Sequence, residues 1–506
     1  MERGRLEEKM SVLYKSTRGM QEGISASEAI IKGLADDGGL FVPNEIPKLP
    51  VSLSELKDLS YQETAYAVMR EFLSDYTEDE LKSCIEKAYD EKFDTTEIAP
   101  LVKKNGQYFL ELFHGATIAF KDMALSILPH LLTTAMKKND VEKEVVILTA
   151  TSGDTGKAAL AGFADVPGTR IIVFYPKGGV SRIQELQMVT QKGGNTKVIG
   201  VYGNFDDCQT GVKNIFNDKT LKQEMEEKGF QFSSANSINI GRLVPQVAYY
   251  VYAYGRMVKQ GEIESGELLN VVVPTGNFGN ILAAYYAKQM GLPIGTLVCA
   301  SNENKVLFDF LETGCYDKNR GFLLTTSPSM DILISSNLER LIYALCKESF
   351  EQNATLMRSL SETGRYEITA EMKSGLRDFF GAYATEEEVF STIHDIYEKT
   401  GYVIDTHTAV AAAADEKYRK ARPEEEKIKS VIISTASPFK FAQSVMKAVA
   451  PSYEEADDFK LADELSRLAG VKVPAAIEEI RKAEILHGQV CDAVDMQRVV
   501  RESLGI

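Results

Sequence analysis

The sequence predicts an α/β protein with a mainly helical N-terminal domain followed by two doubly wound α/β domains. From about residue 100, short runs rich in Val and Ile alternate with helical patterns, which is typical of parallel sheets. These runs are continuously apolar, as expected for strands covered on both faces. The first ninety-odd residues carry amphipathic helical patterns and lack such runs.

The N-terminal domain is predicted over residues 1–95. It opens with a strand-like piece at 12–14 and a Gly/Pro-rich turn at 36–43. Helical patterns at 52–73 and 77–89 follow, with Ser or Thr as N-caps. We predict that residues 96–140 and 265–506 form the larger α/β domain and that residues 141–264 form the smaller one.

Six segments are predicted as buried strands, and the chain ends in a helical extension. The strands are expected at 144–149, 170–175, 196–202, 268–274, 297–300 and 430–434. After about Tyr453 the chain is charged, and its apolar periodicity runs through Ile477, Ile480, Ile485 and Val490. This pattern predicts helices packed on the body of the protein.

Composition excludes several classes of function. The 506 residues hold 57 Lys and Arg against 73 Asp and Glu, a net charge of −16, which disfavours a nucleic-acid or anionic-membrane partner. The six cysteines form no CxxC pair, so we expect reduced thiols in the cytoplasm and no metal site. Residues 1–9 are too charged for a signal peptide, and no apolar run could cross a membrane.

Three predicted strand ends run into small, hydroxyl-bearing or Gly-rich residues, at 149–157, 274–280 and 434–441. Ligands bind at the carboxyl ends of strands in such sheets. The Gly-rich turn at 276–280 opens a helix and could cradle a phosphate, whereas the spacing of a dinucleotide fingerprint is missing. Taken singly, each segment also fits an ordinary turn or helix cap.

A fourth segment, residues 112–122, places Lys121 in mostly apolar surroundings at the start of a helix. Desolvation lowers the pKa of a lysine, which makes its amine a usable nucleophile and base. A lysine that extends from a helix end into solvent fits the same spacing.

Together these segments resemble the motifs of threonine synthases. The matching segments are 114–122, 150–156, 276–280 and 434–440, in that order along the chain. Residues 33–43, 181–188, 236–242 and 327–332 are also similar to segments of the longer members of that family. The resemblance covers nearly the whole chain and implies a fold-type II pyridoxal-phosphate enzyme, similar in fold to the tryptophan synthase β-chain.

The resemblance implies conversion of O-phospho-L-homoserine and water to L-threonine and phosphate, with pyridoxal 5′-phosphate as cofactor, by a monomer or homodimer. Lys121 would hold the cofactor as a Schiff base. Its neighbours would be Phe120, Asp154, Thr435 at the ring nitrogen, and Gly276, Asn277, Phe278, Gly279 and Asn280 at the phosphate. Thr151, Ser152 and Thr155 would bind the substrate carboxylate, and Asn236, Ser237 and Arg242 its phosphoryl group.

Two positions depart from the family pattern. Asp154 stands where many fold-type II enzymes have Asn, and we hypothesise that it shares a proton with the cofactor. Ser437 stands where the family often has His, which leaves a side-chain role there in doubt. Asp405 and His407 suggest a metal pair, which we interpret as structural because no zinc-site spacing is present.

Other functions stay open at this point. On the same scaffold, a phospho-lyase would release a 2-oxo acid, ammonia and phosphate. A non-catalytic relative would keep the fold as a binding module, and a dinucleotide-dependent oxidoreductase lacks the required motif.

Overall fold

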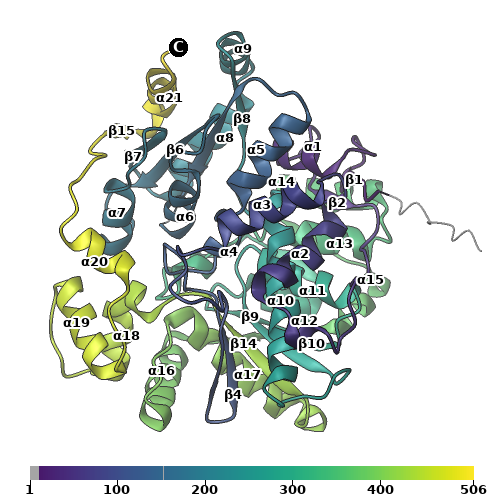
Figure 1. Cartoon of the computed structure of the whole chain (residues 1–506), viewed down its shortest axis with the longest axis vertical. Coiled ribbons are helices and arrows are strands. Elements are labelled where there is room, and N and C mark those ends of the chain that lie inside the picture. Colours follow the sequence, from purple (N-terminus) through teal and green to yellow (C-terminus); the bar gives the residue numbers. More distant parts are fainter. Residues whose placement is uncertain (1–10, 152) are drawn as a thin grey trace, which may run out of the picture.

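A computed structural model describes residues 11–151 and 153–506. Two mainly parallel sheets organise the chain (Figure 1): a six-stranded sheet in the order β13-β10-β9-β14-β4-β3 and a five-stranded sheet in the order β15-β7-β6-β5-β8. This confirms the predicted α/β class. Within the described residues, no helix is long and apolar enough to cross a membrane.

The N-terminal part is mainly helical, as expected. It comprises β1 (Tyr14–Ser16), α1 (Ala26–Lys32), β2 (Phe41–Pro43), α2 (Tyr61–Phe72) and α3 (Glu78–Ala88). The single helix expected over 52–73 is shorter, because Ser60 and Glu63 form a reciprocal capping box that starts α2 at Tyr61. Thr77 caps α3 in the same way.

Helix α2 packs against α10 (Ile240–Lys259), the long buried helix of the molecule. The rings of Tyr61 and Tyr252 meet edge to face with centroids 5.3 Å apart. The N-terminal part is therefore joined to a helix whose first turn carries Arg242.

The larger sheet is covered on both faces. Val271 and Val273 of β9 join the hydrophobic core that contains α10 and α11 (Gly279–Gln289), whereas Val272 between them joins the core of α16 (Glu386–Thr400) and α17 (Thr406–Ala421). This explains the unbroken apolar runs. The other strands are β3 (Leu101–Lys104), β4 (Gln107–Glu111), β10 (Ile294–Ser301), β13 (Phe379–Tyr383) and β14 (Lys429–Ser434), with β9 at Leu269–Pro274.

The smaller sheet is sandwiched in the same manner, by α6 (Asp154–Phe163) and α7 (Arg182–Val189) on one face and α8 (Phe205–Asn217) and α21 (Met496–Leu504) on the other. Its strands are β5 (Glu144–Ala150), β6 (Thr169–Pro176), β7 (Thr196–Tyr202), β8 (Phe230–Ser233) and β15 (Val490–Asp492). All six predicted strands are present.

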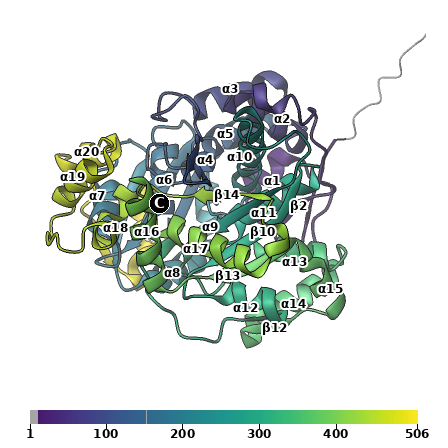
Figure 2. The same ribbon diagram turned by 90° about the horizontal axis from the view of Figure 1, so that it is seen from below.

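The C-terminal extension differs from the expectation in two respects. Helices α19 (Asp458–Ala469) and α20 (Ala475–Arg481) lie at one side of the molecule (Figure 2), but the helical periodicity stops at Ile480, since Ile485 and Val490 are exposed. The chain then pairs β15 with β7 of the smaller sheet. Residues 490–492 therefore lie in the smaller sheet, whereas the sequence predicts that residues 265–506 form the larger domain with a C-terminal helical extension.

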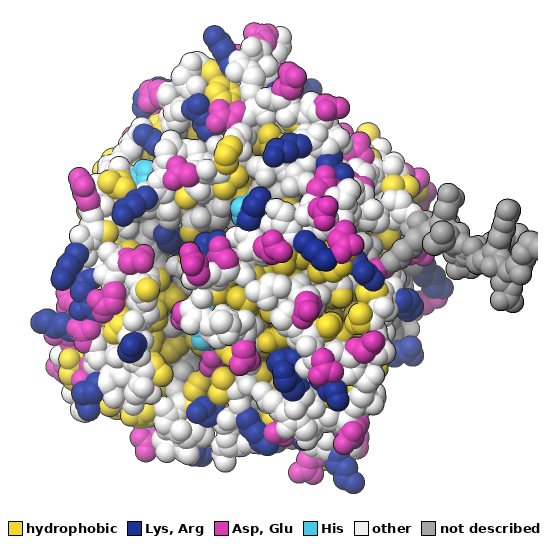
Figure 3. Space-filling model, viewed as in Figure 1, with side chains coloured by type: hydrophobic (Ala, Val, Ile, Leu, Met, Phe, Trp, Pro, Cys, Tyr) yellow, Lys and Arg dark blue, Asp and Glu magenta, His cyan; other side chains and the backbone are white. Residues whose placement is uncertain are grey.

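The remaining elements lie mostly around the larger sheet. They are α4 (Asp122–Leu125), α5 (Leu128–Lys138), α9 (Lys219–Glu227), α12 (Val306–Thr313), β11 (Cys315–Asp317), α13 (Leu338–Leu345), α14 (Phe350–Thr363), β12 (Arg365–Glu367), α15 (Ala370–Ser374), α18 (Ala442–Val449) and the 3-10 turns η1 (Leu56–Asp58), η2 (Pro328–Met330), η3 (Gly375–Asp378), η4 (Pro423–Glu425), η5 (Pro438–Phe441) and η6 (Ala493–Asp495). Acidic and basic side chains are interspersed over the face seen in Figure 3.

Candidate active site

A cavity of about 1690 Å³ lies where the carboxyl ends of strands from both sheets meet. Most of the site residues expected from the sequence line it. Those residues are Phe120, Lys121, Thr151, Thr155, Asn236, Ser237, Arg242, Gly276, Asn277, Phe278, Gly279, Asn280 and Thr435. Ser152 lies outside the described residues, and Asp154 lies behind the wall rather than on it.

Lys121 and Thr435 are held next to each other by the backbone. The N–H of Phe120 donates to the carbonyl of Thr435 at 2.8 Å, and the N–H of Ser437 donates to the carbonyl of Ile118 at 3.1 Å. Lys121 is the N-cap residue of α4. The two segments, far apart in sequence, therefore form one unit at the cavity.

The Lys121 amine lies in a desolvated place. Burial lowers its pKa to about 8, which the charge of Asp154 opposes and the charges of Lys440 and Arg242 assist. The amine also donates to Ser329 Oγ at 3.3 Å. A substantial fraction of such a lysine is neutral, and hence nucleophilic, near neutral pH.

Asp154 lies at the first turn of α6 with its two oxygens in different surroundings. Oδ1 contacts Lys440 Nζ at 2.9 Å and accepts from Gln184 Nε2 at 2.9 Å. Oδ2 accepts from Ser329 Oγ at 2.9 Å and lies 3.8 Å from Lys121 Nζ. Burial acts to raise the pKa of Asp154, but Lys440 and then Lys121 outweigh it and hold the pKa well below its usual range.

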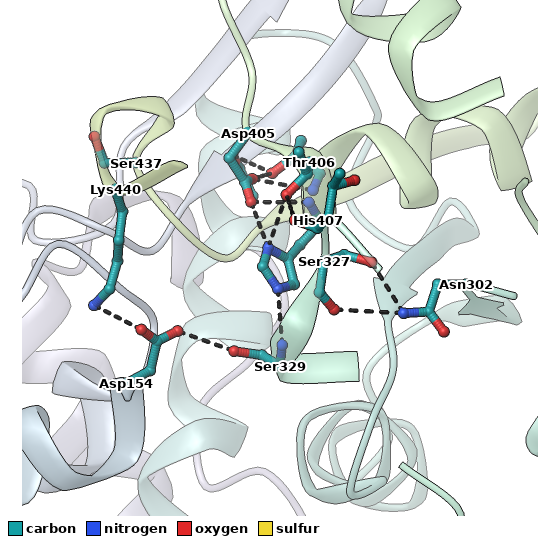
Figure 4. A network of polar contacts seen from close by, with 12 residues as sticks. Asp154, Asn302, Ser327, Ser329, Asp405, Thr406, His407, Ser437 and Lys440 are labelled. Carbon is teal, nitrogen blue, oxygen red and sulfur yellow. Dashed lines mark hydrogen bonds and ion pairs between the residues drawn. The ribbon is translucent and has the colours of Figure 1, made fainter. Parts of the chain in front are cut away.

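Sequence reasoning assigned no role to Ser329, which lines the cavity. Its hydroxyl lies between the Lys121 amine and Asp154, and its contact with Asp154 is seen in Figure 4. Its N–H donates to His407 Nε2 at 3.2 Å, and His407 Nδ1 lies 2.7 Å from Asp405 Oδ2. The Asp405–His407 pair is thus used to hold a loop of the cavity. The described residues contain no group of three or more His, Cys, Asp or Glu that could hold a metal ion.

The Gly-rich turn forms a cradle at the N-terminus of α11. Phe278, its N-cap residue, is left-handed with φ 62°. A Cβ on Gly276 would lie 2.6 Å from the carbonyl oxygen of Ser329, so only glycine fits this close approach. The first N–H groups of a helix have no partner within it and attract anions.

Neighbouring residues fix this cradle in place. Ser335 Oγ donates to the carbonyl of Gly276 at 2.7 Å, and the N–H of Asn337 donates to the carbonyl of Asn277 at 3.0 Å. Asn280 Oδ1 accepts from the hydroxyls of Tyr249 and Tyr250, at 2.5 Å each, while its Nδ2 is buried without a partner. The structure thus leaves a fixed donor unused at the cradle.

The turn before α6 uses Thr151 as a cap. Thr151 Oγ1 accepts from the N–H groups of Gly153 and Gly156, both at 2.9 Å. The hydroxyl hydrogen of Thr151 is therefore left to donate elsewhere. Thr155, one residue into α6, also lines the cavity.

Arg242 is a buried cation in the first turn of α10. Its Nη1 donates to the carbonyl of Ala235 at 3.0 Å, and its Nε is buried without a partner. Burial lowers its pKa to about 10. A guanidinium held in this way presents unused donors to an anion in the cavity.

Three models of known protein families match successive parts of the chain. Residues 13–89 match the profile described as Threonine synthase N terminus, residues 96–436 match Pyridoxal-phosphate dependent enzyme, and residues 408–485 match Threonine synthase, C-terminal.

Individual relatives and a solved structure point to the same family. Threonine synthase-like 1 of Homo sapiens is 42% identical over 439 residues, which are 84% of this chain but only 58% of that protein. Threonine synthase of Schizosaccharomyces pombe is 39% identical, over 88% of this chain and 90% of its own. The crystal structure of PLP-bound threonine synthase from Brucella melitensis superposes with a TM-score of 0.84 at 33% identity, over 98% of this chain and 99% of its own. The chain belongs to the threonine synthase family of pyridoxal-phosphate dependent enzymes.

Proposed function

We propose that this chain converts O-phospho-L-homoserine and water to L-threonine and phosphate, with pyridoxal 5′-phosphate as cofactor. One observation carries the proposal. A single cavity is lined by two groups that suit anions, the cradle of α11 and the guanidinium of Arg242, together with the desolvated amine of Lys121. A phosphorylated cofactor and a phosphorylated substrate need such a pair of places.

The residues present fit the cofactor. The cradle at 276–280 supplies backbone donors and the unpaired Nδ2 of Asn280 for a phosphate. The hydroxyl of Thr435 would face the ring nitrogen, and the amine of Lys121 would hold the aldehyde carbon. When bound, the cofactor supplies an electron sink for carbanion chemistry at the substrate.

The substrate's own groups would be divided between two elements. Thr151, Ser152 and Thr155, at the start of α6, would bind its carboxylate. Asn236, Ser237 and Arg242, at the start of α10, would bind its phosphoryl group. Arg242 suits this role because its fork of donors matches phosphate oxygens.

Proton movement is assigned to Lys121. With a pKa of about 8, its amine exists in both protonation states near neutral pH and can take a proton from one substrate carbon and return one to another. Ser329, between Lys121 and Asp154, would hold the freed amine in place.

The products test the reaction. The purified chain, loaded with cofactor and given O-phospho-L-homoserine, should release phosphate and threonine in equal amounts. Release of phosphate with 2-oxobutanoate and ammonia would instead establish the phospho-lyase. No phosphate release by cofactor-loaded protein would overturn both reactions.

We also propose that the protein works in the cytoplasm on this small-molecule substrate, as a monomer or homodimer. The six cysteines support this location. All are free thiols, five of them buried, and a reducing compartment keeps thiols from forming disulfides. Fractionation of the source cells with an antibody to the chain tests the location.

A further inference from the structure

A second buried lysine lies behind the wall of the cavity. Lys440 belongs to the 3-10 turn η5 that follows β14, and its side chain has no exposed surface. Its Nζ contacts Asp154 Oδ1 at 2.9 Å (Figure 4) and also donates to the carbonyl of Thr117 at 3.0 Å. Lys440 is absent from the cavity lining, so it acts on the site through its contacts and its charge and not by touching a ligand.

Asp154 therefore lies between two lysine amines. Oδ1 faces Lys440, and Oδ2 faces Lys121 at 3.8 Å through the hydroxyl of Ser329. Lys121 has to give up its charge whenever its amine acts as a nucleophile. A buried carboxylate whose only cation disappears is strongly destabilised.

We propose that Lys440 is a positioning residue whose charge compensates Asp154, so that the amine of Lys121 is free to become neutral. The inference rests on the proposed role of Lys121. Because Asp154 and Lys440 together carry no net charge, Lys121 lies beside a neutral pair rather than beside a bare carboxylate. Burial then decides the protonation of Lys121.

The charges around these groups agree with this assignment. After burial, the charges that act on Lys121 are those of Asp154, Lys440 and Arg242, of which only Asp154 favours the ammonium form. Asp122 and Lys157 also lie within the field of Lys440, and neither is among the groups whose charges act on Lys121. Asp154 is the one carboxylate that contacts Lys440 among the described residues.

The test measures the Lys121 amine in the full-length chain freed of cofactor. Trace acetic anhydride is applied from pH 6 to pH 11, and acetylation of the Lys121 peptide is quantified by mass spectrometry. The wild type should show a midpoint near pH 8. Lys440→Met should raise that midpoint by at least about one unit, an ~5-fold loss of labelling at pH 8, while Lys440→Arg keeps it.

A double variant separates charge from structure. Asp154→Asn alone should lower the midpoint of Lys121, because Lys440 then repels it without a partner. Adding Lys440→Met to Asp154→Asn should return the midpoint to within half a unit or so of wild type, since both charges of the pair are gone. Lys157→Met, which removes a half-buried lysine whose charge does not act on Lys121, should leave the midpoint of Lys121 unchanged.

Two results would overturn the proposal. One is a folded Lys440→Met protein in which Lys121 titrates as in wild type. The other, which decides the matter even if Lys440→Met does not fold, is an equal midpoint for Asp154→Asn and the double variant. Because the readout is the free amine, loss of threonine production alone neither supports nor contradicts the inference.

Discussion

The two walls of the cavity hold their ligand groups by different means. The wall carried by β9 and α11 is built from backbone and neutral side chains, which Ser335 and Asn337 fix by hydrogen bonds to Gly276 and Asn277. The wall behind Lys121 is built from buried charges. Binding at the first wall should therefore be sensitive to changes of shape. The chemistry at the second wall should be sensitive to changes of charge and pH.

The largest effect is expected at the charged wall. Lys121→Ala removes the amine that would hold the cofactor and move protons, so turnover of O-phospho-L-homoserine should fall at least ~10³-fold. Lys157→Met is the matched control, because burial lowers the pKa of Lys157 to about 8 as well, yet this lysine does not line the cavity. Steady-state phosphate release measures both. Equal losses of turnover in the two variants would contradict the catalytic role of Lys121.

Arg242 tests whether the second anion-binding place belongs to the substrate. Arg242→Met should raise KM for O-phospho-L-homoserine by ~10- to 100-fold, the loss expected for hydrogen bonds to a charged group. The affinity for pyridoxal phosphate should stay unchanged. Arg242→Lys should recover only part of KM, because an ammonium lacks the fork of donors. A weaker affinity for pyridoxal phosphate with an unchanged KM for O-phospho-L-homoserine would reverse the assignment of the two anion-binding places.

The backbone wall should fail through shape. Gly276→Ala places a Cβ 2.6 Å from the backbone oxygen of Ser329, a clash that no side-chain rotation relieves. The expected cost of about 1–2 kcal/mol corresponds to a roughly tenfold weaker affinity for the cofactor. Gly488→Ala, where an added Cβ meets nothing within 4 Å, is the control. Equilibrium titration of the apoprotein followed by absorbance measures both affinities, and equal values would contradict the cradle.

The smallest effect concerns stability and pH. Burial opposes the charged form of His114, but hydrogen bonds to Asp94 and Glu111 raise its pKa to about 9. Since the unfolded pKa is about 6.5, this stabilisation is complete below that pH and is lost as pH rises toward 9.

We expect about 1 kcal/mol to disappear between pH 6 and pH 9.5, a value reduced for the exposure of Asp94. Urea unfolding at both pH values measures it, with His114→Gln as the reference that lacks this titration. A His114→Gln protein with the wild-type pH dependence would remove His114 from the account.

Much of the fold could be predicted because its strands are covered on both faces. Runs such as 268–274 carry consecutive β-branched residues, here Val271 to Val273, so their pattern alone indicates a buried strand. Strand β4, with the sequence QYFLE, and strand β13, with FFGAY, have no such run and were missed. Helix α2 is shorter than the predicted range 52–73, because its start depends on the Ser60–Glu63 capping box rather than on apolar spacing.

The candidate site divides in the same way. Lys121 and the turn at 276–280 could be singled out because each combines an unusual residue pattern with a strand end or a helix start. The segments that hold Lys440 and Ser329 could be singled out, but the roles of these two residues could not, since the roles arise from contacts with Asp154, which lies far from both along the chain. The residues around Lys440 do not indicate that this lysine is buried, and its contact with Asp154 shows why the burial is tolerated.

Chemical trapping of the cofactor shows whether Lys121 holds it. The purified chain is saturated with pyridoxal phosphate, its visible absorbance is recorded, and borohydride is added before peptide mapping. We expect a band at roughly 410–420 nm that disappears on reduction, with the adduct on Lys121. Absence of a band and of any adduct, or an adduct on another lysine such as Lys157, would contradict this role of Lys121.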